Sequence, residues 1–250
     1  MLYFDNAATT KADPEILEKF NEYQTEKYFN PSSLNRFSAE VAKDIALARE
    51  RIGGALGLNP DGVIFTSGGT ESANTAIFGV PLRNGCNIVT TETEHSAVYN
   101  SAISMKNKGC EVRFAAAKPD GSVDEEDLAE KVDGKTVLVA VMHVNNETGA
   151  INDIKNLVKI VKAKNGDALF FSDGTQAAGK IPLNVSGMGV DMYALSGHKF
   201  HAPKGVGALY VKKGVHLKPF HIGGGQENGM RSGTENVGGI VAMSCALEKA

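Results

Sequence analysis

The stretch TVLVAVMHVNNETG, residues 136–149, is the most informative part of the chain for its fold. It is apolar almost throughout until it reaches a polar, asparagine-rich turn. A continuous apolar run of this kind is typical of a strand buried on both faces, as in a parallel sheet covered by helices. The next segment, DIKNLVKIVKAKNG (153–166), has apolar residues at helical spacing and stops at Gly166. A buried strand followed by an amphipathic helix predicts an α/β unit.

The same alternation extends over the whole chain, with no internal repeat and no evident linker. Further strands are expected within 62–67, 87–92, 111–116, 168–172 and 191–196, and helices within 13–24, 38–57, from 70 onward, 96–109 and 123–132. Another strand within 204–215 is expected to run back against the others. We therefore predict an α/β three-layer sandwich with a mostly parallel, mixed sheet.

Charge and hydropathy argue against two classes of partner. Lys and Arg number 26 against 29 Asp and Glu, a net charge of -3, and no long block of one sign occurs, so no nucleic-acid partner is expected. No apolar run approaches about twenty residues, so no membrane association is expected. The start, MLYFDNAATTKADPE, has no signal-peptide pattern. These features predict a cytoplasmic protein.

The three cysteines give no sign of a metal site or a disulfide. Cys86, Cys110 and Cys245 lie far apart in the sequence without a CxxC spacing. This distribution predicts neither a zinc site nor a disulfide framework. We expect them to be small buried side chains.

Candidate functional residues follow the apolar runs, because ligands of such sheets bind beyond the carboxyl ends of the strands. After VIF, Gly68 and Gly69 permit close backbone approach where a helix begins, and the helix amides with the Thr70 hydroxyl suit a phosphate. After NIVTTE, His95 suits stacking on a flat ligand or proton transfer. The NNETG turn offers Asn146. Taken singly, each is as easily explained as an ordinary turn.

Two further strand ends carry opposite charges. Asp173 follows ALFFS, and a carboxylate there is costly to bury unless a cation faces it. Gln176, three residues on, is placed to reach the same ligand. After MYAL come Ser196, His198 and Lys199. An amine in such a pocket has a lowered pKa and in its neutral form attacks carbonyls, so Lys199 is a candidate Schiff-base residue.

Together these side chains predict one ligand, pyridoxal 5'-phosphate. It combines a phosphate, a flat ring, a cationic ring nitrogen, a phenolic oxygen and an aldehyde. In this interpretation Asp173 keeps the ring nitrogen protonated, Gln176 binds the ring oxygen and His95 lies over the ring. Lys199 binds the aldehyde. The phosphate is held by Gly69, Thr70, Ser196 and His198.

A family resemblance rests on seven strings that occur in order between Leu2 and about Val237. They are YFDNAATT, FTSGGTESAN, TETEHSAV, MHVNNETG, SDGTQAAGK, SGHKFHAPKGVGALY and GGGQENGMRSGTEN. The chain resembles the cysteine desulfurases of the NifS and IscS type, in the class V aminotransferase group of fold-type I pyridoxal phosphate enzymes. The resemblance implies the large domain of that fold. It also implies release of sulfur from L-cysteine as an enzyme persulfide, leaving L-alanine, with Lys199 and His95 as catalytic residues.

The resemblance has further implications for the site and its partners. It places Asn146 near the substrate and a cofactor oxygen. It implies a homodimer in which Thr234 reaches the phosphate in the neighbouring subunit. The implied substrate is L-cysteine or a related amino acid, and the implied protein partner is a sulfur acceptor or an iron–sulfur scaffold.

The chain departs from the family pattern in two places. Where the family reads Asn-Pro-x-Ser-x-His-x-x-Gly, the string NPSSLNRFS has Asn35 for the histidine and Ser38 for the glycine. Family members also continue beyond SCALEKA into a segment with the persulfide-forming cysteine and a carboxylate-binding arginine. We expect this chain to lack both. The expected organisation is an arm at 1–13, from the small domain or the edge of the active site, a large cofactor-binding domain at 14–250, and no C-terminal small domain.

Two alternatives share the same residues. Another class V lyase or aminotransferase, such as a selenocysteine lyase, would have the same cofactor contacts. A non-catalytic, dimerising fragment would keep the cofactor pocket as a relic. A zinc enzyme is disfavoured because no further ligands accompany His198 and His201 at a usual spacing. Mononucleotide binding is disfavoured because no GxxxxGK string occurs.

Overall fold

The computed structural model describes residues 2–250 and has a seven-stranded sheet at its centre. The strand order is β1-β7-β6-β5-β4-β2-β3, and β7 runs antiparallel to both of its neighbours while the other pairs are parallel. The strands are β1 (Val63–Thr66), β2 (Asn87–Thr91), β3 (Glu111–Ala115), β4 (Thr136–Ala140), β5 (Leu169–Asp173), β6 (Met192–Ser196) and β7 (Gly207–Val211). The predicted mixed sheet, with its returning strand, is confirmed.

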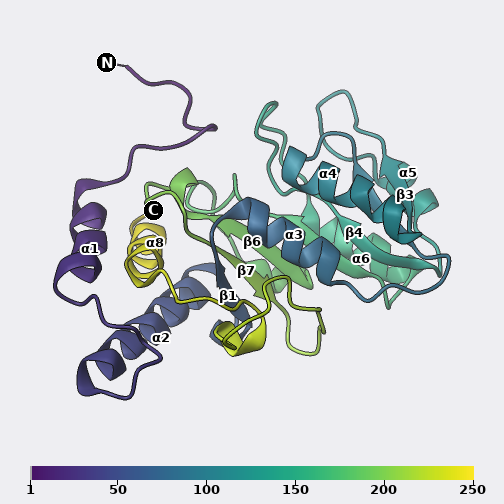
Figure 1. The fold of residues 1–250 in the computed structure, drawn as a ribbon. Coiled ribbons are helices and arrows are strands. Elements are labelled where there is room, and N and C mark those ends of the chain that lie inside the picture. The colour runs from purple at the N-terminus through teal and green to yellow at the C-terminus, as the bar shows by residue number, and fades with distance from the viewer. Residues whose placement is uncertain (1) are drawn as a thin grey trace.

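Helices cover both faces of the sheet, which makes the three layers (Figure 1). One face packs against α3 (Gly69–Gly79) and α4 (Ser96–Ser104). The other face packs against α2, α5, α6, α7 and α8, and α1 packs on α8. Their bounds are α1 Pro14–Thr25, α2 Arg36–Leu56, α5 Glu125–Lys131, α6 Ile154–Lys164, α7 Val185–Met188 and α8 Val237–Lys249. Four short 3-10 helices occupy Pro60–Gly62, Met105–Lys108, Gly197–Lys199 and Glu227–Gly229.

The start of α2 shows what one departure from the family pattern does locally. The Asn35 side chain accepts the backbone N–H of Ser38 at 3.0 Å and so caps the helix. The helix therefore begins at Arg36, two residues before the expected start. Its end at Gly57, where φ is +65°, agrees with the sequence pattern.

The segment between β7 and α8 is fastened to the sheet by two buried carboxylates. Glu227 accepts hydrogen bonds from Arg49, 2.7 Å to Nη2, and from the backbone of Phe65. Glu71, in the first turn of α3, accepts Arg231 Nε at 2.9 Å. In both ion pairs the carboxylate is buried and the arginine is partly exposed, and the pairs hold the segment between β7 and α8 in place.

Among residues 2–250, no helix has both the length and the apolar content needed to cross a membrane.

Candidate functional site

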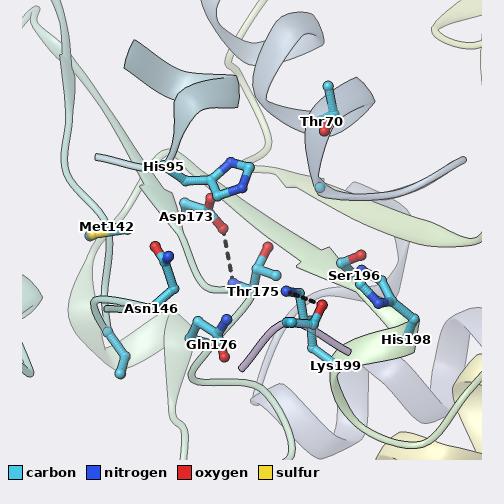
Figure 2. A pocket seen from close by; sticks show the side chains of 13 residues that line it. Thr70, His95, Met142, Asn146, Asp173, Thr175, Gln176, Ser196, His198 and Lys199 are labelled. Atoms are coloured by element: carbon cyan, nitrogen blue, oxygen red, sulfur yellow. Dashed lines mark hydrogen bonds between the residues drawn. The ribbon is translucent and has the colours of Figure 1, made fainter. Parts of the chain in front are cut away.

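A cavity of about 300 Å³ opens at the carboxyl ends of the parallel strands. It lies where ligands of such sheets bind. Figure 2 shows His95 and Thr70 on one side, Gln176 and Lys199 on the other, and Asp173 and Thr175 between them. Its lining consists of Ala8, Gly69, Thr70, His95, Met142, Val144, Asn146, Asp173, Thr175, Gln176, Ser196, His198 and Lys199.

Asp173, the last residue of β5, forms part of the cavity wall and is 7% exposed. Its Oδ1 accepts the backbone N–H of Thr175 at 2.9 Å. Within residues 2–250 this carboxylate forms no ion pair shorter than 4 Å. The Thr175 hydroxyl beside it is buried without a hydrogen-bond partner. The cavity thus presents a carboxylate and a hydroxyl with bonding capacity to spare.

The turn from β1 into α3 gives the cavity a narrow backbone cradle. Gly68 has φ of +152°, a conformation that favours glycine. A Cβ on Gly69 would lie 2.9 Å from the Thr175 hydroxyl oxygen, so any side chain there would fill the cradle. The first amides of α3 have no partners within the helix and carry its positive dipole end. This corner suits an anion.

Ser196 and His198 line the cavity near that corner. Ser196 ends β6 and is buried. His198 Nδ1 lies 2.9 Å from the Thr9 hydroxyl. Burial lowers the pKa of His198, and the positive charges of Lys199 and Lys204 lower it further. A cationic neighbourhood of this kind also favours an anionic ligand group.

Lys199 ends the 3-10 helix that follows β6, and its amine lies against the N-terminal segment. Nζ donates to the carbonyl oxygens of Ala7 at 2.5 Å and Ala8 at 2.8 Å. Burial lowers the pKa of this amine, an effect opposed by the negative charges of Asp173 and Asp5. A lowered pKa increases the fraction of neutral, nucleophilic amine.

The same N-terminal segment is joined to the strand end after β6. Thr10 donates its backbone N–H and its hydroxyl to the carbonyl of His198, each at 2.9 Å. Gln176 Nε2 donates to the carbonyl of Ala7 at 2.8 Å, while its Oε1 accepts Lys180. Because Oε1 is taken by a cation, the amide turns its NH2 group toward the cavity side and Ala7.

His95 caps α4 and borders the cavity. Its Nδ1 accepts the backbone N–H of Ala97 at 3.1 Å, so the neutral ring carries its proton on Nε2. The preceding residue, Glu94, is buried and accepts the backbone N–H of Met142 at 2.7 Å and the Thr91 hydroxyl. Burial raises the pKa of Glu94 to about 8. The Glu94 carboxyl therefore ties the end of β2 to the end of β4 in a mainly protonated form at neutral pH.

The NNETG turn separates into structural and cavity residues. Asn145 Oδ1 accepts the backbone N–H groups of Glu147 at 2.8 Å and Thr148 at 2.9 Å, so Asn145 builds the turn. Asn146 lines the cavity and donates to the carboxylate of Glu147.

Nine of the ten predicted site residues line this one cavity, and Thr234 does not. It lines another hollow, of about 290 Å³, together with Tyr23, Lys27 and Asn236. The role expected for Thr234 belongs to a neighbouring subunit and stays a prediction, as do the roles of the other nine.

The sequence analysis did not single out four lining residues, Ala8, Met142, Val144 and Thr175. Thr175 could have been found, because it lies between Asp173 and Gln176 in the same turn. Met142 and Val144 continue an apolar run and carry no polar signal. Ala8 reaches the cavity only through the path of the N-terminal segment, which no local pattern reveals.

Comparisons with known proteins agree with this geometry. The model of the family described as aminotransferase class-V matches residues 2–249. A cysteine desulfurase of Trichormus azollae is 44% identical over 250 residues, covering 99% of this chain and 62% of that protein. A cysteine desulfurase IscS of Dictyoglomus turgidum is also 44% identical, over 100% of this chain and 64% of that protein. The chain thus spans less than two thirds of these curated relatives.

Solved structures give the same likeness. A NifS-like protein superposes with a TM-score of 0.97 at 41% identity, covering 99% of this chain and 69% of the other. A structure described as SspA in complex with cysteine has a TM-score of 0.95 at 34% identity, covering 99% and 72%.

Proposed function

This chain belongs to the class-V aminotransferase family. From that premise we propose that it binds pyridoxal 5'-phosphate and acts in a cysteine desulfurase, an enzyme that takes sulfur from L-cysteine. The observation that carries the proposal is the joint placement of Asp173 and Lys199 on one cavity that also has an anion-binding corner. The similarity to cysteine desulfurases supports the choice of substrate within the family.

The cavity fits this cofactor by the chemistry of its groups. Asp173, which accepts one backbone hydrogen bond, and the Thr175 hydroxyl, which has no partner within residues 2–250, have bonding capacity left for a polar ring. The Gly69 cradle leaves room for a phosphate at the start of α3. When bound, pyridoxal phosphate supplies an aromatic ring that accepts the electrons released at the α-carbon of an amino acid.

The residues of this chain divide the work around that ring. Lys199 supplies the amine that holds the aldehyde and is placed to carry a proton at Nζ. Asp173 holds a proton on the ring nitrogen by its negative charge. His95, whose Nδ1 accepts the Ala97 N–H, lines the cavity and would lie against the ring. Thr70, Ser196 and His198 line the cavity and would hold the phosphate, and Gln176, whose Oε1 accepts Lys180, would offer its NH2 group to the ring oxygen.

We propose a homodimer as the working form, with a sulfur acceptor as its partner. Exposed apolar side chains support the dimer, among them Tyr28 at 67%, Leu34 at 106% and Phe37 at 47% exposure. Of these three residues, Tyr28 lines the cavity that also includes Thr234 and Asn30. Light scattering of the purified chain tests the dimer, and a monomer at micromolar concentration would contradict it.

The cofactor proposal is tested by covalent trapping. The chain is mixed with pyridoxal phosphate, its visible absorbance is measured, and the sample is reduced with borohydride and digested for mass spectrometry. We expect a yellow protein with the cofactor mass on Lys199. The variant K199A should lose both signals, whereas K213A, which removes an exposed lysine beyond β7, should keep them.

The choice of substrate is tested on the same samples. Addition of L-cysteine should change the absorbance more than addition of L-alanine or L-serine at equal concentration. A loaded protein that responds equally to all three would contradict the desulfurase assignment and leave the cofactor assignment standing.

A further inference from the structure

Two cysteines that lie 24 positions apart in the sequence meet at the amino end of the sheet. Cys86 immediately precedes β2 and Cys110 immediately precedes β3. Their Sγ atoms lie 3.0 Å apart, and both are free thiols. The expectation of small buried cysteines is confirmed for Cys86 and Cys110, whereas Cys245 is only partly buried; the contact between Cys86 and Cys110 was not predicted. Cys245, the third cysteine, lies in α8 with its sulfur 3.3 Å from Arg51 Nη1.

The backbone around the pair suits a disulfide. Strands β2 and β3 are parallel with Asn87 opposite Glu111, so Cys86 and Cys110, one residue earlier, also face each other. The backbone N–H of Glu111 donates to the carbonyl of Cys86 at 3.0 Å, which continues the ladder. Adjacent strands lie about 4.8 Å apart, and disulfides bridge Cα atoms about 4.4–6.8 Å apart. A bond therefore requires the sulfurs to approach by about 1 Å, without a change of strand register.

The two thiols are buried in the folded protein, but the residues that precede them are exposed. Cys86 is 2% and Cys110 3% exposed. Burial raises the pKa of Cys110 to about 12, and its contact with Cys86 adds to the effect. The residues just before each cysteine are exposed: 83–85 form a loop, and 106–109 end the 3-10 helix Met105–Lys108. Strand β3 also lies at the edge of the sheet, where local opening costs less free energy than in the centre.

We propose that Cys86 and Cys110 are a site of reversible thiol oxidation, where a small disulfide such as oxidised glutathione converts the pair into an intramolecular disulfide. In an opened edge, the Cys110 thiolate attacks one sulfur of the oxidant and displaces the first thiol. The Cys86 thiolate then attacks the Cys110 sulfur and displaces the second. Two electrons pass from the two cysteines to the oxidant, and the two cysteine protons end on the two released thiols.

The disulfide would link the edge strand β3 to β2, at the end of the sheet away from the cofactor cavity. It would close the segment 86–110, which includes β2 and α4, and so would restrict the unfolded chain. The cavity residue His95 follows the opposite end of β2, about 16 Å along a five-residue strand. The oxidised protein should therefore be more stable yet keep its affinity for pyridoxal phosphate.

The experiment is an equilibration of the purified chain with oxidised glutathione or diamide. Free thiols, counted after acid quenching and unfolding, should fall from three to one. A tryptic digest should contain a linked peptide pair with Cys86 and Cys110. The melting temperature should rise by about 5–10 °C and return on addition of dithiothreitol.

Matched variants separate this pair from the third thiol. C245S should behave as the parent chain, with two thiols lost. C86A and C110A should show no intramolecular bond and no oxidant-dependent rise in melting temperature, although each folds in reducing buffer. The proposal is overturned if the parent chain keeps three thiols both in native buffer and in urea just below its unfolding transition. Disulfides found only between chains, or only with Cys245, overturn it as well.

Discussion

Asp173 and Glu71 are buried to nearly the same degree, with 7% and 8% of each residue exposed, but their surroundings differ. Glu71 accepts hydrogen bonds from Arg231, from the backbone of Ser67 and from His221. Burial by itself would raise the pKa of Glu71, but the hydrogen bonds from Arg231 and Ser67 and the charge of Arg231 hold that pKa below its usual value. Asp173 has one backbone donor and opens onto a cavity. A buried carboxylate whose partners are all in the chain supports the fold, whereas one that lacks a cation and faces a cavity is available to a ligand.

Glu94 sharpens this comparison: within residues 2–250 it forms no ion pair, and burial favours its protonated form. Its pKa is raised to about 8 by burial, from 4.5 in the unfolded chain. Between these two pH values the unfolded state loses its proton while the folded state keeps it, so this group lowers stability as pH rises through that window. Relative to E94Q, the parent chain should lose on the order of 4–5 kcal/mol of unfolding free energy from pH 4.5 to pH 8.

Urea unfolding of both proteins at several pH values measures this difference. The glutamine in E94Q keeps a side-chain oxygen that accepts the Met142 N–H. The variant therefore preserves this contact and removes only the titrating group. A difference between the two proteins that does not vary with pH would mean that Glu94 is ionised in the fold.

Removal of Glu71 should have the next largest effect, on stability. The variant E71A leaves Arg231 and the Ser67 amide without their buried acceptor. Loss of one partner of a buried pair costs about 3–4 kcal/mol, and urea unfolding measures it. D173N provides the matched comparison, because in the described part of the chain no cation pairs with Asp173 and none is left behind. Equal losses for E71A and D173N would break the distinction between the two carboxylates.

Asp173 should instead show its importance in cofactor binding. In D173N a charge-assisted hydrogen bond to the ring nitrogen becomes a neutral one, so affinity for pyridoxal phosphate should fall about 10–100-fold. The unfolding free energy should change by less than about 1 kcal/mol. Fluorescence titration with the cofactor and urea unfolding measure the two quantities, and unchanged affinity would argue against the assigned role.

The smallest effect is expected at Lys180, which binds the oxygen of the Gln176 amide. The variant K180M frees that amide to rotate, so cofactor affinity should fall about threefold. Q176E tests the same contact from the other side, because a carboxylate has no NH2 group to present. If K180M binds the cofactor as the parent does, the orientation of Gln176 does not depend on Lys180.

The sheet and the main site residues could be predicted because each depends on local sequence. Apolar runs mark the strands, and the parallel-sheet rule gathers Asp173 and Lys199 at one edge although 26 positions separate them. The start of α2 was missed by two residues, because the cap formed by Asn35 depends on a side-chain rotamer. The contact between Cys86 and Cys110 was missed because strand register, which spacing does not encode, brings them together.

The contacts of the N-terminal segment with Lys199 could not be predicted from local sequence patterns either. Nothing in the composition of DNAATT indicates that the Ala7 and Ala8 carbonyls accept Lys199. The prediction of a separate arm at 1–13 is not tested by this contact, although Ala8 does line the cavity.

The make-up of the cavity has one further consequence, for the stage of folding at which the proposed cofactor can bind. Its walls combine the segment near Ala8 with strand ends as late as Lys199, so no short peptide contains a complete binding surface. Assembly requires contacts between residues that are distant in the chain, which form late because closing long loops costs entropy. The visible absorbance of bound cofactor should therefore appear during renaturation only when the complete fold has formed. Its time course would measure the rate of this last folding step.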